Sequence, residues 1–486
     1  MENRNNTIRS FLSILLKSAL ALALFAGAWH VLTPLFRLDR NIDGDQYRNL
    51  PENTLDVLCL GSSHIQYSFS PAVFYAETGL YSYVLGSPCQ PVQSSYAVLD
   101  EALKTQHPSV VIMDVFTLLP QSEVCYADGL FYKALDMTTG KTRAEAAEAV
   151  PNEEMRTAYR FDLIMNHDNW KRMDLKELGK ILENARKADG FNENLGFVPM
   201  EVTDPVYMPL ITYDTSETVE LSSDDILWLD RIVNRCRDEG IVLILMKSPF
   251  IIDQENTNIL HAVWRYAESR NVEYADFIAE ASSLNWFIGM DGDTWHNNVW
   301  GAEIITKELA RRIQTDHPAA SHRENAVWES LLQKAQSKLA GSLMNEMNVD
   351  PYRLLDEAAK YPSITMLAYH GRGNTTIGPG ENDLLNRAGF AKDFIHDFST
   401  DYYAVAVQGE LIQAGSGPFT IEYNGAQIRL AADGIYINGE SVCGPGEMQL
   451  VFAAPDYAWT NGIPVNYASR WFWKNGCDGF DCTVAW

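Results

Sequence analysis

The stretch Asp56-Val-Leu-Cys-Leu-Gly-Ser-Ser-His-Ile65 decides the fold, because its hydrophobic run stops abruptly at Gly61-Ser62-Ser63. A short buried strand that ends in Gly-Ser-Ser and leads into a helix presents a hydroxyl group at the carboxyl edge of a parallel sheet. Backbone N–H groups at the start of such a helix favour negative charge at the same point. The sequence therefore predicts a strand over 57–60 with a polar site at its end.

Further apolar runs repeat this pattern of a strand followed by a helix. The run Ser109-Val-Val-Ile-Met113 is continuous, which is typical of a strand covered on both faces. The predicted strands are 57–60, 81–85, 109–113, 241–246 and 272–274, and the predicted helices are 92–103, 222–240, 262–269 and 302–313. Five units in this order predict an α/β fold with a doubly wound, flavodoxin-like, five-stranded parallel sheet, and its site lies outside the carboxyl ends of the strands.

A second motif, Asp293-Thr-Trp-His296, precedes the last of these helices. A serine hydroxyl is a weak nucleophile that needs an adjacent base, and a carboxylate commonly orients a histidine base. His296 is the expected base and Asp293 its orienter, with Asp291 as the alternative orienter. Taken alone, Gly-Ser-Ser also fits a helix cap and Asp-x-x-His a surface turn, but together they indicate acyl chemistry. No third ligand stands at a usable spacing, so we expect neither a metal nor a cofactor.

These motifs resemble those of the SGNH (GDSL-type) hydrolase superfamily over roughly residues 50–315. The form Leu-Gly-Ser-Ser-His with Asp-Thr-Trp-His-Asn-Asn-x-x-Gly is most similar to its cell-envelope branch. That branch includes the D-alanyl-lipoteichoic acid protein DltD and the alginate-type O-acetyltransferases. The resemblance implies that Ser63, rather than Ser62, is the nucleophile, with His296 as base and Asp293 as orienter.

The resemblance also indicates which groups stabilise the oxyanion. The backbone N–H groups of Ser63 and Gly86 match the first two donors of the superfamily. The third donor is usually an Asn, where this chain has Asp114, and an ionised carboxylate cannot donate a hydrogen bond. The side-chain amide of Gln90 is a candidate substitute. We expect His64 and His167 near the site, lining the substrate or serving the structure rather than catalysing.

Composition excludes several classes of protein. The chain has 486 residues and a net charge of −26, which argues against nucleic-acid binding because no basic stripe offsets the acidic residues. Seven cysteines are too few for a disulfide scaffold. A hydrophobic share of 46% favours well-packed domains over disorder.

The N-terminus predicts a membrane segment. Residues 11–36 are almost wholly apolar, long enough to cross the bilayer, and follow a short tail over 1–10. A cleaved signal peptide is the alternative, since Ala26-Gly-Ala28 resembles a cleavage site, but the apolar run continues beyond it. We therefore expect an uncleaved single-pass anchor in the plasma membrane. Placement of the bulk of the chain outside the cytoplasm is implied mainly by the resemblance.

The rest of the chain divides into three predicted parts. Residues 37–318 contain the SGNH-like domain, and a helical insertion over 118–210 resembles a lid or an acceptor platform. Residues 319–360 read as a helical linker, and 361–486 as a β-rich or α+β accessory domain. Four tryptophans of this last part offer a glycan-stacking face or, as the blander alternative, ordinary core: Trp459, Trp471, Trp473 and Trp486.

Together these features predict a membrane-anchored, extracytoplasmic serine esterase or acyltransferase. The acyl group would be acetyl or D-alanyl, and the acceptor a cell-envelope polysaccharide or a teichoic-acid-like polyol polymer. A membrane-bound O-acyltransferase is a candidate partner. The alternatives are a non-catalytic envelope scaffold or glycan-binding protein on the same fold, and a deacetylating esterase of the secreted type.

Overall fold

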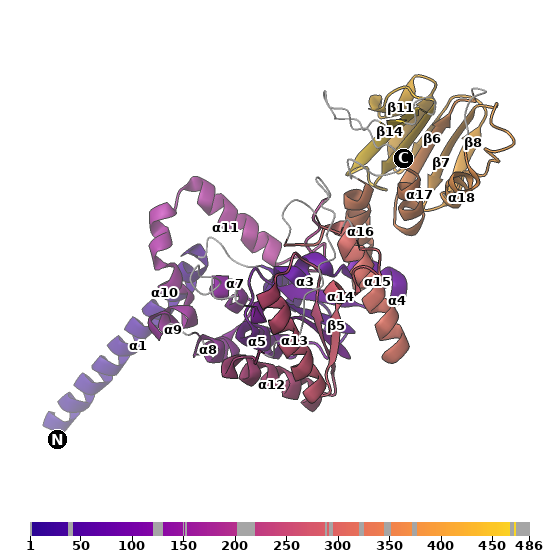
Figure 1. Cartoon of the computed structure of the whole chain (residues 1–486). Coiled ribbons are helices and arrows are strands. Elements are labelled where there is room, and N and C mark those ends of the chain that lie inside the picture. Colours follow the sequence, from indigo (N-terminus) through magenta and orange to yellow (C-terminus); the bar gives the residue numbers. More distant parts are fainter. Residues whose placement is uncertain are drawn as a thin grey trace.

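The computed structural model describes residues 2–36, 42–119, 130–148, 150, 153–201, 219–286, 289–290, 295–319, 325–344, 351–371, 377–466 and 471–472. Three parts follow one another along the chain in Figure 1. They are a long N-terminal helix, an α/β part and a β-rich C-terminal part.

The α/β part is built on a five-stranded sheet in which every pair of neighbouring strands is parallel. Its strands are β1 (Val57–Gly61), β2 (Ser82–Gly86), β3 (Val110–Asp114), β4 (Val242–Lys247) and β5 (Glu273–Asp276). Their order is β2-β1-β3-β4-β5, which is the order of flavodoxin-like sheets. The predicted parallel α/β sheet is confirmed, and all five strands lie within two residues of their predicted places.

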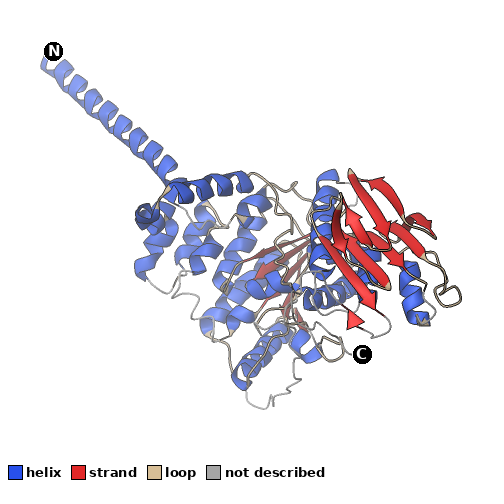
Figure 2. Ribbon diagram, turned by 90° about the horizontal axis from the view of Figure 1, so that it is seen from above, coloured by secondary structure: helices blue, strands red, loops and turns tan. Residues whose placement is uncertain are grey.

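Helices cover both faces of this sheet, as Figure 2 shows. They are α2 (Asp43–Arg48), α3 (Ser63–Ser68), α4 (Pro71–Thr78), α5 (Val92–Ala102), η1 (Phe116–Leu118), α12 (Ser223–Asp238), α13 (Gln254–Ser269), α14 (Phe277–Glu280) and α15 (Val299–Asp316). One face packs Leu58 and Leu60 with residues of α5, α12 and α13. The opposite face packs Val57 and Cys59 with residues of α15. Alternate residues of β1 thus enter two different cores, which explains its unbroken apolar sequence.

The insertion between β3 and α12 is helical where it is described, as predicted. It contains α7 (Leu130–Leu135), α8 (Gly140–Glu148), α9 (Glu153–Arg160), α10 (Asp162–Asn166), η3 (His167–Arg172) and α11 (Leu175–Ala188). The helices α7 and α8 pack on α5, whereas α10, η3 and α11 pack near the end of α1. In Figure 1 these helices lie between the sheet and α1.

A short extended segment after α11, residues 194–200, reaches the carboxyl end of the sheet. The N–H of Val84 in the edge strand β2 donates to Leu195 O at 2.9 Å. The N–H of Val198 then donates to Gln66 O in α3 at 2.8 Å, and the N–H of Val299 donates to Met200 O at 2.9 Å. This segment therefore covers the edge of the sheet and joins β2, α3 and α15.

The N-terminal helix α1 (Glu2–Phe36) fits the predicted membrane segment. Its residues Phe11–Thr33 have a mean hydropathy of 2.0, and none of this stretch is buried by the rest of the chain. It is long and apolar enough to span a membrane, a property that signal sequences share. Its end contacts the insertion, where Asn169 Nδ2 donates to Phe36 O at 2.7 Å.

The C-terminal part has two antiparallel sheets, which confirms the predicted β-rich region. A six-stranded sheet has the order β15-β14-β13-β6-β7-β8, and a four-stranded sheet the order β12-β11-β10-β9. A shared apolar core fills the space between the two sheets. The elements are α17 (Pro351–Lys360), β6 (Ile364–Tyr369), α18 (Pro379–Arg387), β7 (Tyr402–Val407), β8 (Glu410–Gly415), β9 (Phe419–Tyr423), β10 (Ala426–Ala431), β11 (Gly434–Ile437), β12 (Glu440–Cys443), β13 (Met448–Ala453), β14 (Thr460–Asn466) and β15 (Trp471–Phe472).

The predicted linker is a structural part of the α/β domain. Helix α16 (Ala326–Met344) packs along α4, and its Trp328 is fully buried. The Trp328 ring stacks on Tyr81 at a centroid distance of 4.8 Å, and its Nε1 donates to Thr54 Oγ1 at 2.7 Å. Helix α16 therefore packs on the α/β part through Trp328, although it lies beyond the predicted boundary at residue 318.

One of the predicted glycan-stacking tryptophans is used for packing. Trp459 is half-buried, and its Nε1 donates to Ser337 O in α16 at 3.0 Å. The side chain of Trp471, together with Trp473 and Trp486, lies outside the described residues. Trp459 thus ties the C-terminal part to α16, in agreement with the structural alternative.

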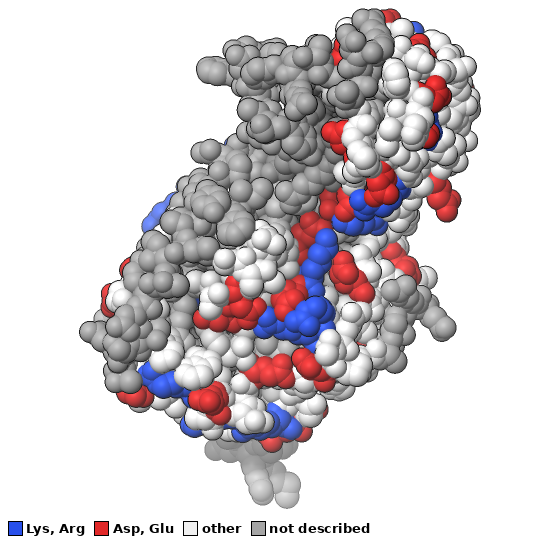
Figure 3. Space-filling view, turned by 45° about the vertical axis from the view of Figure 1, so that its right-hand side comes forward, with Lys and Arg blue, Asp and Glu red and all other residues white. Residues whose placement is uncertain are grey.

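The charged side chains are locally balanced on the face drawn in Figure 3. There Lys and Arg side chains lie next to Asp and Glu side chains rather than forming one continuous basic surface. On α15, for example, Glu308 receives hydrogen bonds from both Arg311 and Arg312. On this face, acidic side chains are thus mixed with basic ones.

Candidate active site

The turn after β1 is shaped by Gly61. Its φ is +137°, and a Cβ atom there would lie 2.9 Å from the Cβ of Asp114, so both conformation and space require glycine. Ser62 caps α3, because its Oγ accepts the N–H of His64 at 3.1 Å. Ser63 is then the first residue of the helix. The sequence therefore places Ser63 at the carboxyl end of β1, an inner strand of the sheet.

Ser63 and His296 form a hydrogen-bonded pair. The Nε2 atom of His296 lies 2.8 Å from the Oγ atom of Ser63, although the two residues are 233 positions apart. This distance is within the range at which a histidine removes a proton from a hydroxyl. The structure therefore brings together the predicted nucleophile and the predicted base.

The segment that follows His296 is fixed by two side-chain hydrogen bonds. The Nδ2 atom of Asn297 donates to Ser68 Oγ at 2.8 Å, which ties the segment to the end of α3. The Oδ1 atom of Asn298 accepts the N–H of Gly301 at 3.0 Å and so caps α15. A Cβ atom on Gly301 would lie 2.3 Å from Gly289 O, so this turn also needs glycine. The Asn-Asn-x-x-Gly sequence after the histidine thus positions the base.

The predicted orienter, Asp293, and its alternative, Asp291, lie outside the described residues. The third member of the triad stays a prediction from the sequence. Among the residues that the structure does describe, no group of three or more His, Cys, Asp or Glu side chains is arranged to hold a metal ion.

Besides Ser63, two residues are predicted to donate to the oxyanion. Gly86 lies at the turn, whereas the side-chain amide of Gln90 is hydrogen-bonded to other groups. Gly86 pairs with Gly61 across β1 and β2, and a Cβ atom on it would lie 3.1 Å from Ser62 O. The buried Gln90 donates from Nε2 to Ser95 Oγ at 3.1 Å and to Leu85 O at 3.5 Å. In this arrangement the amide of Gln90 holds the loop after β2 and has no N–H left for an oxyanion.

Asp114 accepts hydrogen bonds in a buried polar network. Its Oδ2 accepts from Ser62 Oγ at 2.8 Å and from the N–H of Phe116 at 3.2 Å. Its Oδ1 lies 3.5 Å from the Nζ atom of Lys247, and both side chains are fully buried. The prediction that Asp114 is not a donor agrees with these bonds, and Lys247 is a residue that the sequence analysis missed. A lysine directly after the apolar strand 241–246 was the available signal, because a buried lysine is rare without a partner.

His64 belongs to the same network. It is 1% exposed, and its Nδ1 lies 2.9 Å from Lys247 Nζ. Its ring stacks on Phe116 at a centroid distance of 3.7 Å and lies 5.4 Å from the ring of His296. Burial, and after it the charges of Lys247 and His296, hold the pKa of His64 well below its ordinary value. His64 is therefore a neutral imidazole beside the Ser63–His296 pair.

His167 is not brought to the site. Its Nδ1 contacts Ile164 O at 2.7 Å, its Nε2 lies 3.6 Å from Asp168 Oδ1, and its side chain is exposed. The segment that contains it, η3, packs against α1 and α10. Its described contacts are thus made within the insertion and do not include Ser63 or His296, and a role of His167 beside the substrate stays a prediction.

Aromatic side chains form a wall beside the Ser63–His296 pair. The rings of Phe250 and Trp295 are stacked with centroids 6.1 Å apart, and Phe116 lies edge-on to both. On the other side, the Tyr67 ring lies 4.5 Å from that of His296. Trp295 is 42% exposed, whereas Phe116 and Phe250 are buried, so Trp295 is the ring of this wall that faces solvent.

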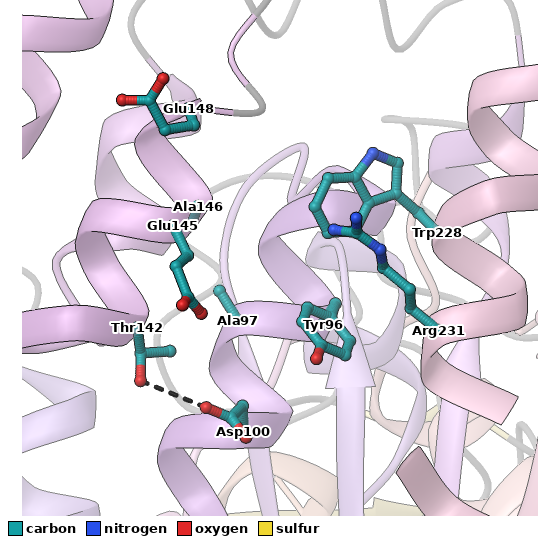
Figure 4. Close-up of a pocket in the computed structure, with 9 residues that line it drawn as sticks. All are labelled: Tyr96, Ala97, Asp100, Thr142, Glu145, Ala146, Glu148, Trp228 and Arg231. Atoms are coloured by element: carbon teal, nitrogen blue, oxygen red, sulfur yellow. Dashed lines mark hydrogen bonds between the residues drawn. The ribbon is translucent and has the colours of Figure 1, made fainter. Parts of the chain in front are cut away.

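A separate cavity of about 440 Å³ lies between α5, α8 and α12 (Figure 4). Tyr96 and Trp228 line one side of it, and Thr142 donates to Asp100 at 3.3 Å on the other. None of the residues that line it belongs to the Ser63–His296 pair or to the buried network. The chemistry indicated by the sequence is therefore located at Ser63 and not in this cavity.

Comparisons with known proteins add no family assignment. No model of a known protein family matches the chain, and no curated protein matches it significantly.

Proposed function

We propose that this protein is a serine esterase or acyltransferase that acts on O-acyl groups. One observation carries this proposal: the 2.8 Å contact between Ser63 Oγ and His296 Nε2 at the carboxyl end of a parallel sheet. In open α/β sheets this is the edge at which ligands bind. The contact supports a nucleophile with its base in place, which a simple helix cap does not require.

The proposed reaction has two halves. Ser63 Oγ attacks the acyl carbonyl carbon while its proton passes to His296 Nε2, and the alcohol of the substrate leaves with that proton. The acyl group is then bonded to Ser63. A second hydroxyl, from a sugar, a polyol or water, gives its proton to His296 and takes the acyl group, and His296 passes that proton to Ser63 Oγ as the acyl–serine bond breaks. Exclusion of water decides between transfer and hydrolysis.

The substrate class follows from the site and from the family resemblance. We propose acetyl or D-alanyl as the acyl group, as the family resemblance implies, and the partly exposed ring of Trp295 offers contact for a small acyl chain. A cell-envelope polysaccharide or a teichoic-acid-like polymer is the proposed acceptor. Helix α1 supports a membrane anchor. The family resemblance implies that this membrane is the plasma membrane and that the remainder of the chain lies outside the cytoplasm. A membrane-bound O-acyltransferase is the proposed partner, because an acyl donor used there has to be delivered across the membrane.

Labelling with a fluorophosphonate probe tests the proposal. The probe forms a bond between phosphorus and the serine oxygen, fluoride leaves, and the hydroxyl proton passes to the base. We expect full-length protein in detergent to be labelled at Ser63. Ser63→Ala should lose labelling and at least about 10³-fold of any acyl turnover. The matched control is Ser282→Ala, an exposed serine of the same domain, which should be labelled like wild type.

Labelling that persists in Ser63→Ala would remove Ser63 as the nucleophile. A wild-type protein that is folded but never labelled would favour the alternative of a non-catalytic scaffold on the same fold.

A further inference from the structure

We propose that Lys247 holds His64 in the tautomer with its proton on Nε2, and that this N–H is the oxyanion donor that Asp114 cannot provide. The inference rests on the proposed function and deepens it. It makes His64 a catalytic residue and Lys247 a positioning residue.

The first step concerns the donors and acceptors around Lys247. Its Nζ lies 2.9 Å from His64 Nδ1, 3.5 Å from Asp114 Oδ1 and 3.3 Å from Ser248 Oγ. A lysine ammonium has three N–H donors and no acceptor. The three partners match these three donors, provided that each of them accepts. His64 Nδ1 must then be unprotonated, which places the proton of the neutral ring on Nε2.

The carboxylate and the aromatic rings around Lys247 oppose the effect of burial on its charge. Burial is the largest influence and lowers the pKa of Lys247, and the carboxyl groups of Asp114 and Asp276 counteract part of this shift. The ring faces of Phe250 and Phe116 lie 4.7 and 5.3 Å from Nζ. Aromatic faces attract a cation, so both rings favour the ammonium. In the proposal, the carboxylate of Asp114 and the two rings keep the proton on Lys247 rather than on His64 Nδ1.

The second step concerns the other nitrogen of His64. Among the described residues, Nδ1 is the ring atom of His64 that has a partner, and Nε2 has none. His64 follows Ser63 directly in the chain, and its ring lies 5.4 Å from the His296 ring that contacts Ser63 Oγ. In the proposal, the Nε2–H group faces the place where negative charge develops on a reacting acyl oxygen.

The third step concerns the missing donor. Asp114, at the position where an Asn donor is expected, accepts three contacts instead, one of them from Lys247. Gln90, the other candidate, uses both amide N–H groups within its own loop. The replacement of Asn by Asp is thus compensated in the proposal. The carboxylate of Asp114 holds Lys247, Lys247 fixes the ring of His64, and His64 supplies the N–H.

The tautomer is tested by ¹⁵N NMR of the full-length protein in detergent micelles with labelled histidine. The His64 signals are identified by their loss in His64→Asn. We expect wild-type spectra to show Nε2 protonated and Nδ1 unprotonated. Lys247→Met, which removes the donor but keeps an unbranched side chain, should give a mixture of tautomers. A proton on Nδ1 in the wild type would overturn the role of Lys247, whether or not the protein is an enzyme.

The oxyanion role is tested by the rate of fluorophosphonate labelling at Ser63. His64→Gln keeps an N–H donor near the Nε2 position, whereas His64→Asn places its amide near the Nδ1 position and leaves no outward donor. Removing one oxyanion donor typically costs about 10²–10³-fold, so we expect a loss of that size in His64→Asn and a clearly smaller one in His64→Gln. Equal rates in the two variants would overturn the oxyanion role while leaving the Ser63–His296 pair intact. Absence of labelling in the folded wild type would instead mean that the proposed function fails, and the oxyanion role with it.

Discussion

Replacing Trp328 by alanine tests whether α16 belongs to the α/β domain. The indole is fully buried, stacks on Tyr81 and donates to Thr54. Truncating a buried tryptophan to alanine costs about 3–5 kcal/mol, and the stacked ring pair accounts for about 0.5–1.5 kcal/mol beyond the buried area. Removal of the indole also leaves the Thr54 hydroxyl without its donor, which adds about 1 kcal/mol. Because these contributions overlap, we expect a loss of about 4 kcal/mol in the free energy of unfolding.

The assay is thermal unfolding of full-length protein in detergent, followed by circular dichroism and by loss of Ser63 labelling. For a domain of this size, 1 kcal/mol shifts the midpoint by about 2–4 °C, so Trp328→Ala should lower it by roughly 8–16 °C. Trp264→Ala on α13 is the matched control, since that indole is 42% exposed and should shift the midpoint little. If Trp328→Ala and Trp264→Ala lose Ser63 labelling at the same temperature, the assignment of α16 to the α/β part is wrong.

Three further outcomes are expected. Gly61→Ala should destabilise the protein and slow labelling of Ser63 more than Gly240→Ala. Both glycines have positive φ, but a Cβ atom at Gly240 meets no atom within 4 Å. Equal labelling rates in the two variants would contradict this. Burial holds the pKa of His64 low, so below about pH 6.5 the unfolded chain binds a proton that the folded chain does not. Acidification should therefore lower the free energy of unfolding by up to about 1.4 kcal/mol per pH unit through this residue. Urea denaturation at pH 7 and pH 5 should show a smaller decrease of this free energy in His64→Gln than in wild type, and an equal decrease would refute the assignment of His64 as a buried neutral imidazole. Finally, Asp293→Asn should retain more acyl turnover than His296→Ala, because it keeps the base and alters only its orientation; the reverse order would remove Asp293 as the orienter.

The fold of the α/β part was readable from the sequence because its strands are short, apolar and separated by helices with clear start signals. Ser222, for instance, was expected to begin a helix, and it caps α12 by accepting the N–H of Asp225 at 3.0 Å. Ser63 and His296 were identified because each stands in a local motif. Both follow strands of one parallel sheet, β1 and β5, and all strands of such a sheet bring their carboxyl ends to one edge.

The remaining differences arise from long-range packing that local patterns do not encode. Helix α16 has the sequence of an amphipathic connector, and only the position of Tyr81 shows which domain buries Trp328. His167 stands in an insertion whose direction depends on the contacts of α10 and η3 with α1. Lys247 was missed because a single lysine at a strand end is normally solvated, and its burial depends on Asp114 and His64 from two other elements.

The 233-residue separation of Ser63 and His296 also bears on how the protein acquires reactivity while it folds. Contacts between residues so far apart form after the local helices, because the loop between them must close first. The pair has its geometry only when the strand before Ser63 and the segment before α15 are both docked, so an incompletely folded chain carries an unactivated serine. In a refolding experiment, Ser63 labelling should therefore appear after the recovery of helical signal. On the proposed function, the nascent chain is until that moment protected from reacting with acyl donors at the wrong place.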